Sequence, residues 1–186
     1  MDENSRRGSF ETLFAEHYVD VRGYVLRRSG AHARSSVDDA VAETFLVAWR
    51  RIEDIGPDPL PWLLGVARRV LANQRRGDRR RLALADQLRR TTTPNQTFAL
   101  APELSDRLRG ALLALSPRER EALMLVAWEG LSPERAAHAA GCSAAAFRVR
   151  LHRARRHLAS HLDAAGELAD GAPPSAGWPT TKETTR

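Results

Sequence analysis

Hydrophobic residues recur along most of this chain at intervals of three and four, the spacing that places them on one face of an α-helix. No run of residues alternates between apolar and polar strongly enough to indicate a β-strand. The pattern therefore predicts an all-α protein. The expected helices run from Phe10 to near Gly30, Val37 to Ile55, Trp62 to Arg81, Leu104 to Leu115, Pro117 to about Glu129, Pro133 to near Gly141, and from after Ser143 to Leu162.

Two of these helices begin with a pair of residues that can cap each other's backbone. Ser36 is expected to cap the helix that starts at Val37, with Asp39 as its reciprocal partner. Ser116 and Glu119 form a capping box for a later helix, because they stand three residues apart around a proline.

The periodicity disappears in the middle of the chain, between about Leu82 and Ser105, and the sequence TTTPN over residues 91–95 is typical of a linker. A chain of 186 residues is long enough for two small domains. We therefore expect two helical domains joined by a flexible linker. The predicted boundaries are a first domain over residues 1–84, a linker over 85–104, a second domain over 105–162 and a disordered tail over 163–186.

The stretch from Ser132 to Leu158 predicts a helix-turn-helix, since Ser132 can cap a first helix and Gly141 lies where a sharp turn would fall. The second helix has one apolar stripe for the core: Phe147, Leu151, Ala154, Leu158 and Leu162. Its other faces carry cationic side chains suited to phosphates and guanine edges: Arg148, Arg150, His152, Arg153, Arg155 and Arg156. Because an ordinary solvated helix face usually mixes charges, and no acid occurs between Gly141 and Leu162, the pattern favours DNA binding.

A second basic segment lies in the expected helix that starts at Trp62. Arginines there alternate with amides, which can read base edges, so we predict a nucleic-acid surface of Arg68, Arg69, Asn73, Gln74 and Arg75. For Arg79 to Arg81 alone, the pattern favours the end of a domain's last helix, fraying into a basic tail. Trp62 could stack on a base or be buried in the core, and the sequence leaves both open.

Acidic residues gather instead at the start of the helix over Val37–Ile55, where Asp38, Asp39 and Glu43 stand beside Phe45. Carboxylates at the amino end of a helix stabilise the helix through its dipole, and this effect alone could explain why acids are found here. The other explanation is that this face binds a protein, because an acidic face would repel DNA.

Composition agrees with a polyanionic partner, because the formal net charge is +6 and the sequence pI is about 10.7.

Cys142 is the single cysteine, so an internal disulfide is impossible and a reducing cytoplasm is the natural compartment. The apolar stretches are too short to span a bilayer, so we expect a soluble protein without membrane insertion.

Three segments together resemble the extracytoplasmic-function (ECF) group of bacterial sigma factors, over roughly Phe10 to Leu162. DDAVAETFLVAW is similar to the family's core-polymerase-binding helix and WLLGVARRVLANQRR to its minus-ten helix. LSPREREALMLVAWEGLSPERAAHAAGCSAAAFRVRLHRAR is similar to its minus-thirty-five domain. The resemblance implies a non-catalytic specificity subunit of RNA polymerase, without cofactor or metal, which recognises and melts promoter DNA.

The resemblance also implies roles for individual residues. Asp39 and Glu43, with Phe45 nearby, match positions that bind the clamp helices of the polymerase largest subunit. The residues implied at the minus-ten element are Trp62, Arg68, Arg69, Asn73, Gln74, Arg75 and Arg76. Those implied at the minus-thirty-five element are Arg135, Ser143, Arg148, Arg150, His152, Arg153 and Arg155. An anti-sigma factor is a further candidate partner.

Two other classes of protein remain as alternatives. A stand-alone transcriptional regulator explains the helix-turn-helix but leaves the basic helix after Trp62 without a role. A metal-dependent enzyme would use His157 and His161, whose i, i+4 spacing can bind zinc, with Cys142 or His152 as a further ligand. The zinc-hydrolase motif requires a glutamate between the two histidines, and the sequence has none there.

Overall fold

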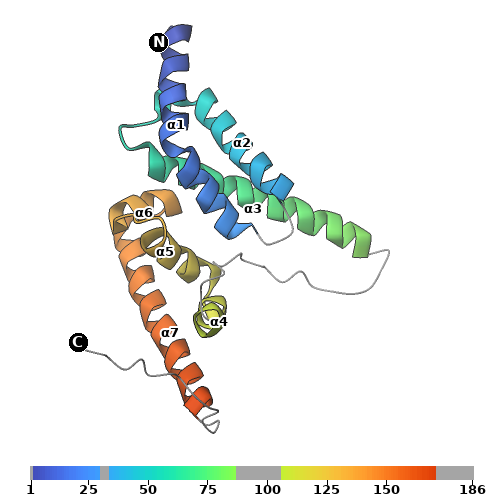
Figure 1. Ribbon diagram of the computed structural model, residues 1–186, viewed down its shortest axis with the longest axis vertical. Coiled ribbons are helices and arrows are strands. Elements are labelled where there is room, and N and C mark those ends of the chain that lie inside the picture. Colours follow the sequence, from blue (N-terminus) through green and yellow to red (C-terminus); the bar gives the residue numbers. More distant parts are fainter. Residues whose placement is uncertain (1, 30–33, 87–105, 171–186) are drawn as a thin grey trace, which may run out of the picture.

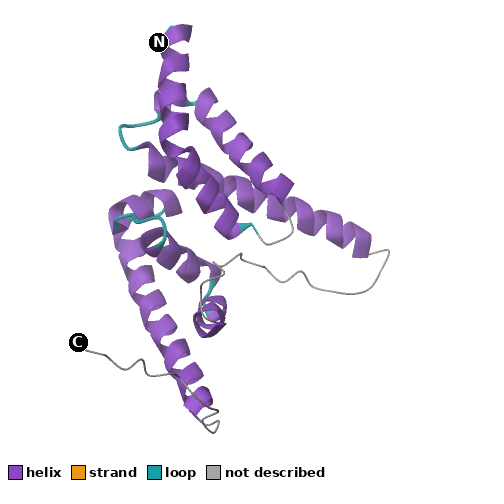
Figure 2. Cartoon of the chain, in the orientation of Figure 1, coloured by secondary structure: helices purple, strands orange, loops and turns teal. Residues whose placement is uncertain are grey.

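The computed structural model describes residues 2–29, 34–86 and 106–170, and within these ranges every regular element is a helix (Figures 1 and 2). The all-α prediction is thus confirmed. The α-helices are α1 (Glu3–Arg28), α2 (Arg34–Arg50), α3 (Pro59–Asp86), α4 (Asp106–Ala114), α5 (Pro117–Ala127), α6 (Pro133–Ala140) and α7 (Ala144–Asp170), and a 3-10 turn, η1 (Ile52–Asp54), follows α2.

Several helix ends differ from those expected. Helix α1 starts before Phe10 because the Asp2 side chain accepts a hydrogen bond from the Ser5 N–H and caps it. Ser36 lies inside α2 instead of capping it. Helix α7 continues beyond Leu162 into the segment that was predicted to be a disordered tail. The predicted linker over residues 85–104 begins too early, because residues 85 and 86 belong to α3. The rest of that linker and the tail after residue 170 lie outside the described residues.

Helices α1, α2 and α3 pack against one another and form an N-terminal bundle (Figure 1). Its core includes Val21, Leu63 and Leu64, all at most 1% exposed. Phe45 is also buried, at 3% exposed, and its ring centroid lies 4.7 Å from that of Phe14. The prediction that Phe45 meets the polymerase therefore needs correction: its ring supports α2 from inside the bundle, because burial against aromatic neighbours stabilises it there.

Helices α4 to α7 form a C-terminal bundle in which α7 packs against the other three helices. The predicted apolar stripe is confirmed, since Phe147, Leu151 and Ala154 are buried. The predicted capping box is present at the start of α5. Arg120 of α5 joins two helices of this bundle, because its guanidinium donates to the Leu112 carbonyl over 2.7 Å near the end of α4.

The helix-turn-helix is also formed as predicted. The Ser132 side chain accepts from the Arg135 N–H and caps α6. Gly141 ends that helix with φ 66° and ψ 44°, the left-handed conformation that glycine adopts without strain. This turn sets the direction in which α7 leaves.

The two bundles are not separate bodies, because α6 packs against α3 and buried residues of both bundles belong to one continuous core. Gly65 of α3 faces the backbone of α6. A Cβ atom at this position would lie 3.4 Å from the Ala139 carbonyl oxygen of α6. A methyl group would therefore just fit at this position, whereas a larger side chain would meet the α6 backbone.

Candidate DNA and polymerase surfaces

The acidic residues of α2 lie on an accessible surface of the N-terminal bundle. Asp39 and Glu43 are exposed, and Leu46, one turn further along, is 46% exposed. The spacing i, i+4, i+7 places all three on one face of the helix. This acidic and apolar face is the part of the predicted polymerase-binding segment that a partner can reach.

The basic residues of α3 divide into two rows. Arg69, Asn73 and Arg76 are exposed, and the Arg76 guanidinium donates to the Asn73 side-chain oxygen. Arg68 and Arg75 are half-buried on the row that also contains Gly65. The structure therefore separates the residues predicted at the minus-ten element into an open row and a covered row.

The covered row is held by specific contacts. The Arg68 Nε donates to the Ala139 carbonyl oxygen of α6 over 3.3 Å, and Arg75 donates to the Arg28 carbonyl oxygen over 2.7 Å. Trp62 is half-buried and packs against the core, which agrees with the prediction of a core position more than with stacking on a base. Gln74 is also half-buried.

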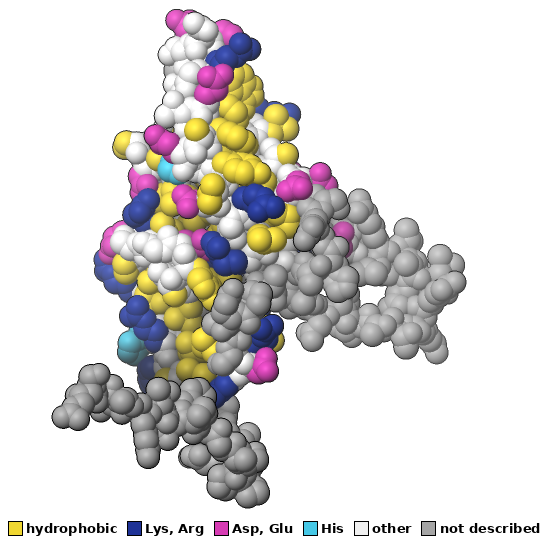
Figure 3. Space-filling view, in the orientation of Figure 1, with side chains coloured by type: hydrophobic (Ala, Val, Ile, Leu, Met, Phe, Trp, Pro, Cys, Tyr) yellow, Lys and Arg dark blue, Asp and Glu magenta, His cyan; other side chains and the backbone are white. Residues whose placement is uncertain are grey.

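Three of the exposed basic residues of α7 lie on one helical row at i, i+4 and i+7: Arg148, His152 and Arg155. Arg153 is exposed on an adjacent face. Figure 3 shows basic groups at the outer edge of the C-terminal bundle, where α6 and α7 lie. Such a row on a helix that follows a tight turn is suited to enter a major groove.

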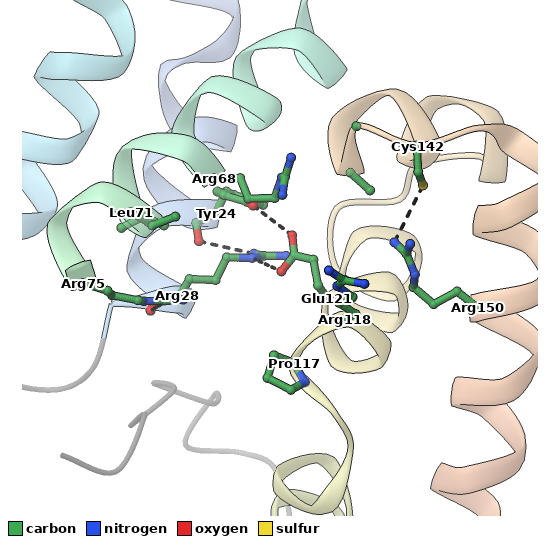
Figure 4. Close-up of a pocket in the computed structure, with 13 residues that line it drawn as sticks. Tyr24, Arg28, Arg68, Leu71, Arg75, Pro117, Arg118, Glu121, Cys142 and Arg150 are labelled. Carbon is green, nitrogen blue, oxygen red and sulfur yellow. Dashed lines mark hydrogen bonds and ion pairs between the residues drawn. The ribbon is translucent and has the colours of Figure 1, made fainter. Parts of the chain in front are cut away.

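Ser143 and Arg150 have local roles in addition. The Ser143 side chain accepts a hydrogen bond from the Ala146 N–H over 3.2 Å at the start of α7. Arg150 is half-buried, and its guanidinium lies 3.7 Å from the Cys142 sulfur (Figure 4). It is thus turned toward the N-terminal bundle and away from the exposed row.

Two arginines predicted to contact upstream DNA bind carboxylates in this structure. Arg135 donates two hydrogen bonds to Asp58, which precedes α3, over 2.8 and 2.7 Å. These hydrogen bonds lower the pKa of Asp58. Arg148 pairs with Glu134 over 2.8 Å and lowers the pKa of that carboxyl in the same way. Both pairs are solvent-exposed, so DNA phosphates can compete for the arginines.

Sequence reasoning missed a cluster of four charged residues and one tyrosine that joins the two bundles. We call it the interdomain cluster: Tyr24, Arg27, Arg28, Glu121 and Glu129. Arg28 is 3% exposed and donates to Glu121 and to Glu129, each over 2.8 Å. The Tyr24 hydroxyl donates to Glu121 over 2.9 Å (Figure 4), and Arg27 also pairs with Glu129. The guanidinium carbon of Arg28 lies 3.6 Å from the centroid of the Tyr24 ring.

Burial and charge shift the titration of this cluster. Burial, followed by the charge of Glu121, raises the pKa of Tyr24 well above its usual range. Burial alone would lower the pKa of Arg28, but its partners Tyr24, Glu121 and Glu129 raise it overall. The phenol is therefore neutral and the guanidinium charged at neutral pH. No short motif links these positions, since Tyr24 and Glu121 are separated by 97 residues.

Beside this cluster, a cleft of about 500 Å³ opens between the bundles (Figure 4). Its charged lining is mainly basic, with one acid: Arg28, Arg68, Arg75, Arg118, Arg150 and Glu121. The cleft therefore has more cationic than anionic side chains in its lining, and it lies along the covered row of α3.

His157, one of the two histidines in the metal-site alternative, contacts a carboxylate of the C-terminal bundle. His157 Nδ1 lies 2.7 Å from a carboxylate oxygen of Glu119, at the start of α5. Among the described residues, no group of three or more histidine, cysteine or acidic side chains could hold a metal ion. Nor is any helix in the described part of the chain long and apolar enough to cross a bilayer.

A helix-turn-helix with a basic second helix, packed on a bundle with its own arginine-rich helix, defines a two-part DNA-binding protein. Comparison with known families adds that residues 13–81 match Sigma-70 region 2 and residues 105–158 match Sigma-70, region 4. The chain belongs to the ECF sigma factors of the sigma-70 family, as the resemblance indicated. It is a sigma factor that directs transcription initiation.

Individual relatives agree over most of the chain. It is 34% identical over 144 residues to the ECF RNA polymerase sigma factor EcfG of Rhodopseudomonas palustris, which covers 76% of this chain and 78% of that protein. It is 35% identical over 169 residues to the RNA polymerase sigma factor CarQ of Myxococcus xanthus, covering 86% and 91%.

Among solved structures, the chain is similar to the sigma factor RpoE in complex with the anti-sigma factor NepR from Bartonella quintana. The TM-score is 0.62 at 26% identity, covering 83% of this chain and 96% of RpoE. CnrH in complex with the cytosolic domain of CnrY gives a TM-score of 0.56 at 28% identity, covering 83% and 88%. The region 2 match extends along the basic helix α3 as far as residue 81.

Proposed function

We propose that this sigma factor divides promoter recognition between its two bundles, without catalytic activity of its own, in the cytoplasm. The acidic face of α2, with Asp39 and Glu43, binds the clamp helices of the polymerase largest subunit. Helix α3 binds the minus-ten element, and the exposed row of α7 enters the major groove at the minus-thirty-five element. The observation that carries this division is the separation of charge: an acidic face on α2 and basic rows on α3 and α7.

The same division explains how two weak DNA contacts, one on α3 and one on α7, can together hold a promoter. Melting DNA costs a few kcal/mol for each unstacked base, and basic side chains beside amides on α3 can offset part of that cost. Binding through α7 raises the local concentration of promoter DNA at α3, provided that the polymerase sets their separation. We propose further that an anti-sigma factor binds this chain, because similar sigma factors have been solved in complexes with such partners.

The test separates the two kinds of contact. Asp39→Arg should weaken binding to core RNA polymerase at least tenfold, because it replaces an exposed carboxylate with a cation on the binding face. Arg153→Ala should leave core binding unchanged and reduce the affinity of the assembled holoenzyme for promoter DNA. Fluorescence anisotropy with core enzyme measures the first, and run-off transcription from genomic fragments with gel-shift analysis measures the second.

Asp163→Arg is the matched control for the first change, since Asp163 is exposed on α7 far along the chain. Arg22→Ala, on an exposed position of α1, is the control for the second. Unchanged core affinity in Asp39→Arg would refute the assignment of α2. A holoenzyme that retains full promoter affinity with Arg153→Ala would refute the role of that residue on α7.

A further inference from the structure

We propose that the cleft between the bundles is a binding site for a small polyphosphate, of the chemical class of the nucleoside triphosphates. Its walls come from the covered row of α3, the start of α5 and the inward side of α7 (Figure 4). It is therefore separate from the open row of α3 and from the exposed row of α7. Promoter recognition as described above requires no ligand of this kind.

The charges that line the cleft are not balanced by the protein. The lining contains five arginines and one glutamate. That glutamate, Glu121, already binds Arg28 over 2.8 Å. Among the described residues, Arg68, Arg118 and Arg150 pair with no carboxylate. A cleft lined by charges of one sign concentrates counter-ions, so a small anion is the ligand that this lining attracts.

These guanidinium groups also keep hydrogen-bonding capacity for a ligand. Arg68 donates from Nε to the Ala139 carbonyl oxygen over 3.3 Å, and Arg150 lies 3.7 Å from the Cys142 sulfur, which is a weak acceptor. A guanidinium has five N–H donors in a planar fork that matches two phosphate oxygens. The donors that the protein leaves over therefore suit phosphate.

A buried donor beside the cleft lacks an acceptor in the described part of the chain. Arg28 lines the cleft and is 3% exposed. Its Nε and Nη1 bind Glu121 and Glu129, whereas its Nη2 is buried without a hydrogen-bond partner. A buried N–H without an acceptor is unfavourable. A phosphate oxygen is an acceptor of the kind that is missing, and this observation is independent of the charge balance.

The size of the cleft and its apolar groups indicate more than a single phosphate. Its volume of about 500 Å³ falls within the range of roughly 300–1,000 Å³ that is usual for small-molecule sites. Leu71, Ala72, Pro117 and Ala140 add apolar groups beside the arginines. Two or three linked phosphates with a less polar remainder match this lining, and a nucleoside triphosphate has that composition.

Isothermal titration calorimetry of the full chain with ATP tests the site directly. At physiological ionic strength, attraction to exposed charges is largely screened. ATP should bind with a stoichiometry of one to one, and pyrophosphate should displace it because the phosphates carry the contact. Adenosine, which has no phosphate, should show no heat of binding.

Two variants remove cations from the cleft, and one matched variant removes a cation elsewhere. Arg118→Gln and Arg150→Gln should each weaken ATP binding at least fivefold. Neither change leaves a carboxylate without its partner, so both chains should fold. Arg156→Gln makes the same change of charge at an exposed position of α7 outside the cleft and should leave ATP affinity unchanged.

The single cysteine of the chain reports whether ATP binds in the cleft itself. Cys142 is half-buried and lines the cleft, so a ligand there should shield its thiol. Saturating ATP should slow the alkylation of Cys142 by iodoacetamide at least fivefold, as followed by mass spectrometry. Adenosine at the same concentration should leave the rate unchanged.

Three results would overturn the site. The first is the absence of saturable ATP binding, and the second is alkylation of Cys142 that saturating ATP does not slow. The third is equal weakening in Arg118→Gln and Arg156→Gln, since ATP would then respond to the overall charge of the chain. Promoter-specific transcription without added ligand is measured separately, so failure of the site would leave the proposed function intact.

Discussion

The capping box at the start of α5 shows how single side chains position a DNA-binding module. The Ser116 hydroxyl accepts from the Glu119 N–H, and the Glu119 carboxylate accepts from the Ser116 N–H over 3.2 Å. The hydrogen bond from the Ser116 hydroxyl, with a further contribution from His157, lowers the pKa of Glu119. When folding lowers the pKa of a carboxyl, the ionised carboxylate stabilises the folded protein at every pH above the unfolded-state pKa. This contribution to the free energy of unfolding is lost as the pH falls through the lowered, folded-state pKa.

Ser116→Ala should therefore reduce the free energy of unfolding by about 1 kcal/mol at neutral pH. The difference from the unmodified protein should shrink once the pH falls below the folded-state pKa of Glu119. Urea unfolding followed by circular dichroism at neutral and acidic pH measures both effects. Ser160→Ala, at an exposed serine of α7, is the control and should change stability by less than about 0.5 kcal/mol. Equal losses for the two variants would contradict a capping role.

At the scale of elements, the turn between α6 and α7 depends on the backbone of one residue. Gly141 has φ 66°, where an L side chain is strained, and its N–H donates to the His138 carbonyl oxygen. The turn allows α7 to leave α6 at the angle that exposes the row from Arg148 to Arg155. The alanines that open α7 contribute no side-chain donors, so the groove contacts proposed for this helix come from residues further along it.

Gly141→Ala should destabilise the protein by about 1–2 kcal/mol, the cost of a side chain in the left-handed conformation. Gly110→Ala is the matched control, for which we expect the opposite effect on stability. Gly110 lies within α4, and nothing lies within 4 Å of a Cβ at that position. It should stabilise by about 0.5–1 kcal/mol, since alanine favours a helix. Thermal unfolding of both variants checks the sign, and two shifts in the same direction would contradict this account.

Across the whole molecule, the interdomain cluster decides how the bundles sit. Arg28 binds both Glu121 and Glu129, so its loss leaves Glu121 without its cation and Glu129 with Arg27 alone. Removing one member of a buried ion pair costs about 3–5 kcal/mol where the other charge stays buried. Separation of the bundles would solvate both carboxylates and avoid that cost.

Arg28→Met should therefore open the molecule without unfolding its helices. The radius of gyration from small-angle X-ray scattering should increase, while the far-ultraviolet circular dichroism stays the same. Arg22→Met, at an exposed position of the same helix α1, should leave both measurements unchanged. If Arg28→Met lost helical signal without expanding first, the cluster would be part of a single folding unit and would not act between bundles.

Much of the fold could be predicted because its causes are local. The period of the apolar residues marked the helices, and Ser116, Ser132 and Gly141 marked boundaries, since capping groups and glycine act within one turn. The stripe of Phe147, Leu151 and Ala154 showed which face of α7 is buried. The start of α1 and the end of α7 were missed because polar residues continue a helix without adding to its apolar period.

The sequence by itself determined the helices, the helix-turn-helix, the basic and acidic segments and, through their order along the chain, the family. Only the tertiary structure decided that Phe45 lies in the core, that Arg68 and Arg69 face different surroundings, and that Arg28 binds acids about a hundred residues away. The physical reason is that periodicity specifies a buried face but not what covers it. The partner of that face is selected by packing and charge between segments that are distant in the chain.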